Sequence, residues 1–296
     1  MSDRDEADLA TFEALRPELI VLAYRMLGDV ARAQDMVQEA WLRWHRREVE
    51  VESPKAFLVT VVTRLCLNEL DSARARREEA RSDRLPEPVD LQEGGMSRLE
   101  DLEQLSMAIL VVLERLRPAE RAVLLLHEVF DFPHEEIAEL VARSPAACRK
   151  LLERARRSVA AGRRLITASR EEHQRLLDAF LRAASAGDVA ALTGLLAADA
   201  TLITDGGSEG RVFKGIRNLR RPLEGAAHVA AFVVATSQRA ALDAEPRELN
   251  GQPALVFSRD GHPFAAVLLA VADGRIQRVF FQADPSRLGH LGRARR

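Results

Sequence analysis

The sequence predicts a multidomain protein in which two all-α domains precede one α+β domain. Amphipathic helical periodicity covers residues 11–78 and again residues 105–166, and a proline-containing acidic stretch separates the two segments. After residue 168 two short helical segments are followed by strand-like segments. Helices first and a meander of strands last indicate helices packed on a curved sheet.

The first segment, residues 11–78, reads as three amphipathic helices. Apolar side chains recur at steps of three and four residues as far as Leu27, where Gly28 interrupts them. A second apolar face runs through residues 33–44, and a polar loop at 46–53 follows it. This loop separates the second helix from the third.

The residues around the polar loop carry the first functional signal. Pro54 is placed to open the third helix, because the first residue of a helix needs no N–H donor. Trp41 and Trp44 fall on the apolar stripe, which favours the core over stacking on an unpaired base, whereas for Phe57 both interpretations stay open. Arginines that could hold a nucleic-acid backbone flank the loop and continue into the third helix: Arg46, Arg47, Arg64, Arg74, Arg76 and Arg77.

The connector between the helical segments is acidic and is predicted to be a flexible linker. Each proline in the sequence LPEP at 85–88 removes a backbone donor and disfavours helix in the residue before it. Between Leu85 and Gln104 six acids oppose one base, a net charge of −5. The predicted boundaries are therefore 1–80 and 105–166 for the helical domains, 81–104 for the linker and 167–296 for the α+β domain.

The second helical segment contains a helix-turn-helix pattern. A short helix after Pro133 leads to a turn and then to Ser144 and Pro145, a good N-cap and a good first helical residue. Between Arg143 and Arg164 eight bases oppose one acid, a net charge of +7. A basic helix face can simply be solvated, but the turn residues and the charge favour DNA binding. Candidates for the major groove are Ala146, Ala147, Arg149 and Lys150, and candidates for phosphate are Arg154, Arg156, Arg157, Arg163 and Arg164.

The α+β domain is expected to begin with two helices. These are predicted at His173–Ala186 and Val189–Leu196, and the strands at Ala200–Thr204, Pro253–Ser258, Phe264–Val271 and Arg275–Phe281. Asp273-Gly274 between the last two strands is a hairpin signal. Asp205 and His262 are interpreted as turn residues and His228 as a buried core histidine.

Composition limits the classes of protein that fit. Of the 296 residues 47% are hydrophobic, which indicates a folded chain. No apolar run reaches the length of a membrane span and residues 1–9 lack a signal-peptide core, so the expected location is the cytoplasm. Cys66 and Cys148 lack metal-ligand spacing and are expected to be buried, inert thiols; no cofactor and no metal is predicted.

Motifs in both helical segments resemble a known family. Residues 22–29 (LAYRMLGD) and 33–41 (AQDMVQEAW), with PKAFL from 54 and RLCLNEL from 64, resemble domain two of the extracytoplasmic-function (ECF) sigma factors of bacterial RNA polymerase. The sequences LRPAERAV from 116, FPHEEIA from 132 and SPAACR from 144 resemble domain four of the same family. The resemblance implies a specificity subunit that binds core RNA polymerase and directs promoter-specific initiation.

The resemblance also implies partners and site residues. The partners are core RNA polymerase, through its beta-prime and beta subunits, and promoter DNA. The family's polymerase-docking helix is the one with Asp35, Gln38 and Glu39. Melted minus-ten bases are expected at Arg46, Arg47, Lys55, Phe57, Arg64, Asn68, Arg74, Arg76 and Arg77, where Phe57 stands in place of the tryptophan of many members. The minus-35 element is expected at Ser144, Ala146, Ala147, Arg149, Lys150, Arg154 and Arg157.

The C-terminal part resembles the SnoaL-like domain, a cystatin-like roll, that is fused to one subgroup of these sigma factors. The sequence LPEP at 85–88 matches the linker motif of that subgroup, with Arg84 in place of its usual tryptophan. The expected function is regulation in cis. The implied regulatory interface comprises Leu85, Pro86, Glu87, Pro88, Asp205, Asn250, Gly251, Asp284, Pro285, Arg287 and Leu288.

A rival hypothesis is a SnoaL-like enzyme, or a small-molecule sensor, with a DNA-binding regulatory half. Its acid–base groups would be Asp205, His228 and His262, which form no pair at a defined spacing. An enzyme is therefore not predicted. A pocket for a small-molecule ligand in the C-terminal domain stays open as an alternative.

Overall fold

The chain divides into two compact units. The computed structural model describes residues 3–77, 84–90, 106–207, 212–213, 216–217, 219, 221–237 and 243–292. The first unit comprises Met1–Glu79, Gly95–Leu99 and Val112–Ala160, and the second comprises Ala80–Gly94, Glu100–Val111 and Ala161–Arg296. The connector at 84–90 therefore belongs to the same unit as the C-terminal α+β domain.

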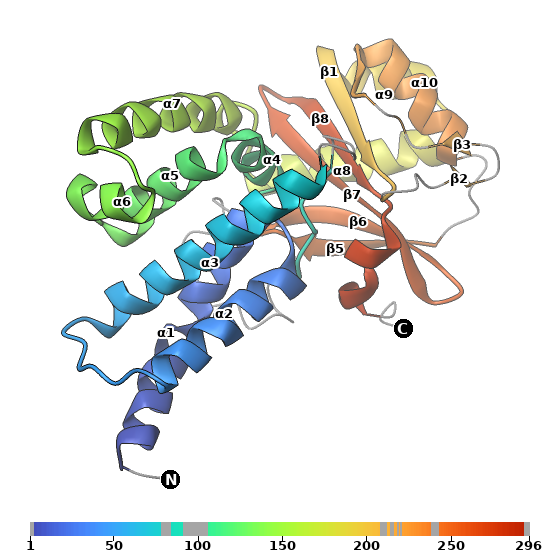
Figure 1. Ribbon diagram of the computed structural model, residues 1–296. Coiled ribbons are helices and arrows are strands. Elements are labelled where there is room, and N and C mark those ends of the chain that lie inside the picture. Colours follow the sequence, from blue (N-terminus) through green and yellow to red (C-terminus); the bar gives the residue numbers. More distant parts are fainter. Residues whose placement is uncertain are drawn as a thin grey trace. The chain divides into compact units, whose positions relative to one another are not determined.

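Three helices build the first part of the chain (Figure 1). They are α1 (Asp3–Leu27), α2 (Val30–His45) and α3 (Pro54–Arg77). The predicted break lies at Gly28, which adopts a left-handed φ of 66° and donates to the carbonyl of Tyr24, 2.7 Å away. Asp29 then caps α2 by accepting a hydrogen bond from Arg32 N at 3.0 Å.

The core of these helices follows the apolar stripes seen in the sequence. Trp44 is 2% exposed, as expected for a core residue, while Trp41 is half-buried against Phe12 with ring centroids 5.0 Å apart. Cys66 and Cys148 are buried and free, and burial raises the pKa of both thiols. Both cysteines therefore stay protonated near neutral pH, in line with the prediction of inert thiols.

The second helical segment has four helices, α4 (Met107–Arg115), α5 (Pro118–Phe130), α6 (His134–Leu140) and α7 (Pro145–Arg163). The expected cap of α7 is confirmed, because Ser144 Oγ accepts a hydrogen bond from Ala147 N at 3.2 Å. Helices α6 and α7 with their short turn form the expected helix-turn-helix. No helix in the described part of the chain is both long enough and apolar enough to cross a membrane.

The C-terminal domain is α+β, as predicted (Figure 1). Its main sheet has the strand order β4-β1-β8-β7-β6-β5, in which only the β1–β8 pairing is parallel. A separate pair, β2–β3, is antiparallel. The elements are α8 (Arg170–Ala186), α9 (Val189–Leu195), β1 (Leu196–Asp205), β2 (Val212–Phe213), β3 (Ile216–Arg217), β4 (Leu223–Glu224), α10 (Ala226–Ser237), β5 (Asp243–Leu249), β6 (Gln252–Arg259), β7 (His262–Ala272), β8 (Arg275–Gln282), and the 3-10 turns η2 (Pro285–Arg287) and η3 (Gly289–Leu291).

Apolar side chains cover both faces of this sheet. One cluster joins the sheet to α8, α9 and α10, and includes Leu177 and Phe180. The other cluster joins the opposite side chains of the sheet to the connector residue Leu85, to Met107 at the start of α4, and to Leu288. The second face is therefore closed by chain from outside the sheet and its helices.

The sequence located β1, β6, β7 and β8, and missed β5, the two-residue strands β2, β3 and β4, and the helix α10. The hairpin at Asp273-Gly274 is confirmed, since both residues have a positive φ, 52° and 68°. Strand β5 contains Pro246 and charged residues, which conceal its pattern, but it lies at the edge of the sheet, where a proline is tolerated.

Two glycine substitutions test the turn at Gly274 and the helix α9, because they should change the stability of the C-terminal unit in opposite directions. Gly274→Ala places a Cβ at a φ of 68°, so we expect a loss of about 1 kcal/mol in the free energy of unfolding of the C-terminal unit. Gly194→Ala in α9 meets open space in a helix and should raise that free energy by about 0.5–1 kcal/mol. Urea unfolding of the full chain measures both changes. Equal midpoints for the two variants would contradict the assignment of the turn.

Candidate functional site

Helix α7 presents the candidate minus-35 residues on its solvent side. Cys148, Leu152 and Ala155 are buried on the other side of the helix. Ser144, Ala146, Arg149, Lys150, Arg154 and Arg157 are exposed, and Ala147 is half-buried. The helix can thus enter a DNA groove with its first turns while its core face stays covered.

Several arginines of α7 have acidic partners within the protein. An Arg154 nitrogen lies 2.6 Å from Glu120 Oε1, and an Arg157 nitrogen lies 3.9 Å from Glu153 Oε1. More than half of each arginine side chain is exposed, so these pairs are screened by water and salt. A DNA phosphate can compete for Arg157 at little cost, whereas Glu120, the partner of Arg154, is mostly buried and also accepts a hydrogen bond from Arg117 N.

Most candidate minus-ten residues lie on or near the loop at 46–53 and α3. Arg46, Lys55, Arg64 and Asn68 are exposed, and the half-buried Phe57 ring lies 5.7 Å from the Trp44 ring. Lys55 Nζ lies 2.7 Å from Glu18 Oε2. Arg74, Arg76 and Arg77 belong to α3, but their side chains lie outside the described part of the structure.

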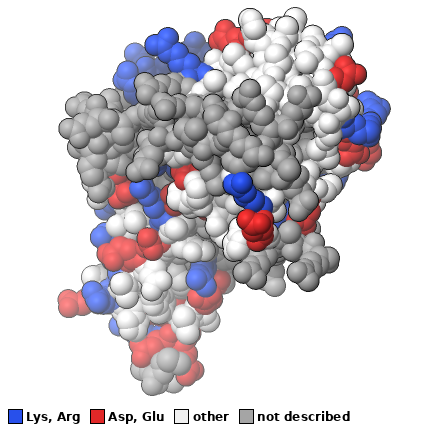
Figure 2. Space-filling model, turned by 90° about the vertical axis from the view of Figure 1, so that its right-hand side faces the viewer, with Lys and Arg blue, Asp and Glu red and all other residues white. Residues whose placement is uncertain are grey.

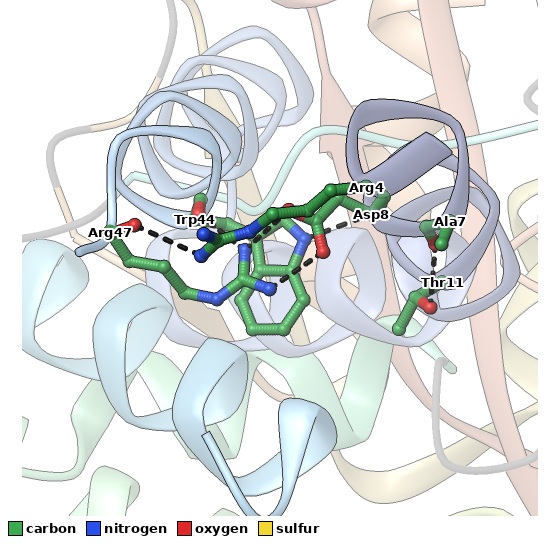
Figure 3. Close-up of polar contacts among 6 residues, drawn as sticks. All are labelled: Arg4, Ala7, Asp8, Thr11, Trp44 and Arg47. Atoms are coloured by element: carbon green, nitrogen blue, oxygen red, sulfur yellow. Dashed lines mark hydrogen bonds and ion pairs between the residues drawn. The ribbon is translucent and has the colours of Figure 1, made fainter. Parts of the chain in front are cut away.

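Arg47, which was expected to contact minus-ten DNA, is bound within the protein. Its guanidinium makes two hydrogen bonds to the Asp8 carboxylate, at 2.6 and 2.8 Å, and one to the carbonyl oxygen of Trp44 at 2.7 Å (Figure 3). The side chains of Arg47 and Asp8 are only 13% and 11% exposed. This pairing neutralises the charge of Arg47 within the protein. A direct contact between Arg47 and DNA stays a prediction, and such a contact would compete with Asp8.

The candidate polymerase-binding residues share the solvent side of α2. Asp35 and Gln38 are exposed, and Glu39 is half-buried with its carboxylate 2.9 Å from Arg43 Nε. The buried residues of the same helix, Ala33, Val37, Ala40 and Trp44, lie on its other side. An acidic and amide surface on a rigid helix is suited to docking on another protein.

The connector at residues 84–90 is held against the C-terminal domain, whereas the sequence predicted a flexible linker. Asp205 Oδ2 accepts a hydrogen bond from Leu85 N at 2.9 Å. Asn250 accepts one from Val89 N at 3.1 Å and returns one from its own N to Val89 O at 2.8 Å. Prolines prevent regular structure here, so the domain supplies the partners that the buried backbone needs. The rest of the predicted linker, 81–83 and 91–104, lies outside the described residues.

The end of the chain contacts the same connector. Arg287 donates to the carbonyl oxygen of Leu85 at 2.6 Å. Leu288 is fully buried, Pro285 opens η2, and Asp284 accepts hydrogen bonds from Ser286. The connector residues Leu85, Pro86, Glu87 and Pro88 are all buried, and Asn250 and Gly251 form the left-handed turn between β5 and β6. The structure therefore gathers the predicted interface residues around the connector or in the turns beside it.

Three further residues at this interface had not been expected. Arg247 lies 2.9 Å from Asp90, and Gln282 donates to Leu85 O at 3.3 Å. His290 contacts Glu87 Oε1 with Nδ1 at 2.6 Å and Pro88 O with Nε2 at 2.7 Å. Each partner is more than 150 positions away in the sequence, so no local pattern marks these residues.

The three side chains that the enzyme alternative would use, Asp205, His228 and His262, have different surroundings. Asp205 is buried and binds Leu85 N and Gly207 N. His228 is exposed, which corrects the expectation of a core histidine, because it lies on the outer side of α10 and contacts the carbonyl of Glu224. His262 is also exposed, beside the turn at Gly261. A ligand pocket in this domain stays a prediction.

Comparisons with known proteins agree with this arrangement. The family model "Sigma-70 region 2" matches residues 11–76, and "Sigma-70, region 4" matches residues 106–159. The ECF RNA polymerase sigma factor SigJ of Mycobacterium tuberculosis is 39% identical over 239 residues, 78% of this chain and 74% of that protein. The probable ECF sigma factor SigI of the same species is 30% identical over 98% of both chains. The crystal structure of SigJ superposes with a TM-score of 0.72 at 31% identity, covering 94% of this chain and 97% of that one.

Substitutions in α7 test its predicted contact with the minus-35 element. Arg149→Ala or Lys150→Ala should each weaken binding to a minus-35 duplex by about 1–3 kcal/mol, if the lost contact is a base contact. Fluorescence anisotropy of labelled duplexes measures the loss, and Arg16→Ala on α1 is the control, since Arg16 is a half-exposed residue paired with Glu13. Unchanged affinity in both α7 variants would remove these residues from the DNA-reading set.

Proposed function

The chain belongs to the ECF RNA polymerase sigma factor family, and on this premise we propose that its C-terminal domain regulates the sigma factor in cis through the connector at residues 84–90. A member of this family directs transcription initiation with core RNA polymerase and promoter DNA. The family contains transcription factors rather than enzymes, so the enzyme alternative is set aside.

We assign each binding function to a different exposed surface of the helical segments. The α2 surface of Asp35, Gln38 and Glu39 binds core polymerase. The loop at 46–53 and the exposed side of α3 bind melted minus-ten bases, with Arg46, Arg64 and Asn68 as direct contacts. The first turns of α7 read the minus-35 element, and the arginines further along it bind phosphate.

The docking of the connector is the observation that supports regulation in cis. The connector lies between the residues that match region 2, which end at 76, and those that match region 4, which begin at 106. Asp205, Asn250 and Arg287 hold its backbone on the C-terminal domain. Any change in this docking alters the path of the only covalent link between the two DNA-binding regions.

Contacts inside the first unit indicate why that path matters. Arg121 of α5 is buried and donates a hydrogen bond to the carbonyl oxygen of Met26, in the last turn of α1. Gly28 packs directly against the Glu114 carboxylate, where a Cβ would clash. The two promoter elements are about 25 base pairs apart, or about 85 Å of duplex. Regions in such contact cannot reach both elements, so they must separate for promoter binding.

Releasing the connector is expected to raise promoter output. The double variant Asp205→Ala, Asn250→Ala removes both side-chain acceptors of the connector backbone. We expect run-off transcription by reconstituted holoenzyme to rise about fivefold or more, the lower end of a coupling of 1–3 kcal/mol. His262→Ala, in an exposed position of the same domain, is the control.

Small-angle scattering and amide exchange complete this test. Increased exchange at Leu85 and Val89 shows that the connector has been released. Wild-type transcription and an unaltered scattering profile, despite this release, would contradict regulation through the connector.

Docking of the connector should also depend on pH. Burial opposes the charged form of His290, but the hydrogen bond and the charge of Glu87 outweigh it and raise the pKa above its ordinary value of 6.5. The stabilisation is therefore complete below pH 6.5 and is lost as the pH rises through the raised pKa. Amide exchange of residues 85–90, corrected for the intrinsic rate, should increase from pH 6 to pH 8. His290→Gln should remove this dependence; an equal dependence in that variant would assign it to another group.

A further inference from the structure

A buried ion pair ties the first turns of α1 to the end of α2. Both nitrogens of the Arg47 fork bind the Asp8 carboxylate, and one of them also binds the carbonyl oxygen of Trp44. The guanidinium carbon lies 3.4 Å from the centroid of the Trp44 ring (Figure 3). Trp44 completes the arrangement, because its indole Nε1 donates to the main-chain oxygen of Asp8 at 3.2 Å. We call these three residues the Asp8–Trp44–Arg47 clamp.

In the clamp, the positive charge of Arg47 is paired with the carboxylate of Asp8. Planar guanidinium, carboxylate and aromatic ring fit one another in a way that lysine could not reproduce. The hydrogen bond from Arg47 also holds the pKa of the Asp8 carboxyl below its ordinary value. Withdrawing Arg47 towards a DNA phosphate would break both short hydrogen bonds to a mostly buried carboxylate and leave it only the longer pairing with Arg4 at 3.9 Å, which is unfavourable.

The surface next to the clamp also disfavours a phosphate. Helix α1 begins with an acidic stretch that includes Asp5 and Glu6. Figure 2 shows acidic side chains gathered at the lower end of the visible face, the height at which α1 begins in Figure 1. A phosphate backbone would be repelled there. Arg47 is therefore better explained as a residue that acts through the protein.

The position of the clamp indicates what it holds. Arg47 follows the C-cap of α2, Arg46, and is the second residue of the loop at 46–53. The next part of the loop is exposed, and Val49 is 73% exposed. The Trp44 ring also packs against Phe57 on α3, beyond the other end of the loop. The clamp thus connects both ends of a solvent-exposed loop to the core of the first unit.

The geometry points to Asp8 and Arg47 as positioning residues that hold the loop at 46–53 in the conformation that captures melted minus-ten bases. This inference rests on the proposed role of the loop in minus-ten binding. A loop that is ordered before binding loses less conformational entropy when the bases enter it. The clamp therefore raises affinity for single-stranded minus-ten DNA without touching it.

The test uses reconstituted holoenzyme with the full-length chain. The probe is a fluorescent single strand that carries the non-template minus-ten sequence of the strongest promoter selected by the wild-type holoenzyme from genomic DNA. Asp8→Asn and Arg47→Lys should weaken its binding about tenfold and reduce discrimination against single-base substitutions in it. Binding of the minus-35 duplex and of core polymerase should not change. Asp8→Glu should restore part of the lost affinity, and Glu13→Gln, which alters an exposed pair on the same helix, should bind like wild type.

Each other outcome overturns the inference. A general loss of stability would lower minus-35 and single-strand binding together, and it would show as a lower melting temperature. Tighter single-strand binding by Asp8→Asn would mean that Asp8 masks Arg47 from DNA. Wild-type affinity and discrimination in folded Asp8→Asn and Arg47→Lys would show that the clamp does not act on the loop. If wild-type holoenzyme fails to bind the probe, the role of the loop fails as well, and the inference with it.

Discussion

A chain segment that is buried without regular structure must find hydrogen-bond partners for its backbone. Residues 84–90 meet this constraint through side chains from strands β1 and β8, the β5–β6 turn and the C-terminal turn η2. In return, the connector supplies backbone donors to Asp205 and Asn250: Leu85 N binds the Asp205 carboxylate, which also accepts from Gly207 N, and Val89 N binds the Asn250 side chain. The organisation of the second unit, and the proposed regulation, depend on these hydrogen bonds between the connector and the C-terminal domain.

The apolar packing leads to the same conclusion. Leu85, Met107 and Val111 are part of the cluster that covers one face of the sheet, although all three precede the C-terminal domain in the sequence. Deleting that domain would expose these side chains as well as remove the proposed regulator. Point substitutions at the interface therefore separate regulation from structural loss more cleanly than truncations do, since they leave the apolar cluster intact.

The arginines of this chain show why charge along a sequence is an incomplete guide to DNA contacts. Arg149 and Arg47 both stand in segments where DNA binding was expected. Arg149 is exposed on α7, whereas Arg47 is mostly buried and paired with Asp8. Arg121, in a motif of the second helical segment, is buried and binds the end of α1. An arginine can neutralise a distant buried carboxylate or cap a helix, and only its environment distinguishes these roles from phosphate binding.

The sequence by itself determined the helical segments other than α10, the helix-turn-helix with its cap at Ser144, four of the strands and the family, because these depend on local periodicity, turn residues and contiguous motifs. It also pointed to Asp205, Asn250 and Arg287 through the resemblance of short motifs. Only the tertiary structure decided that the connector at 84–90 is docked on the C-terminal domain and that His290 and Arg247 help to hold it there. It also decided that the guanidinium of Arg47 is paired with the carboxylate of Asp8. These contacts join residues 39 to 203 positions apart. Burial and pairing at such separations are set by how the elements pack, which no local pattern records.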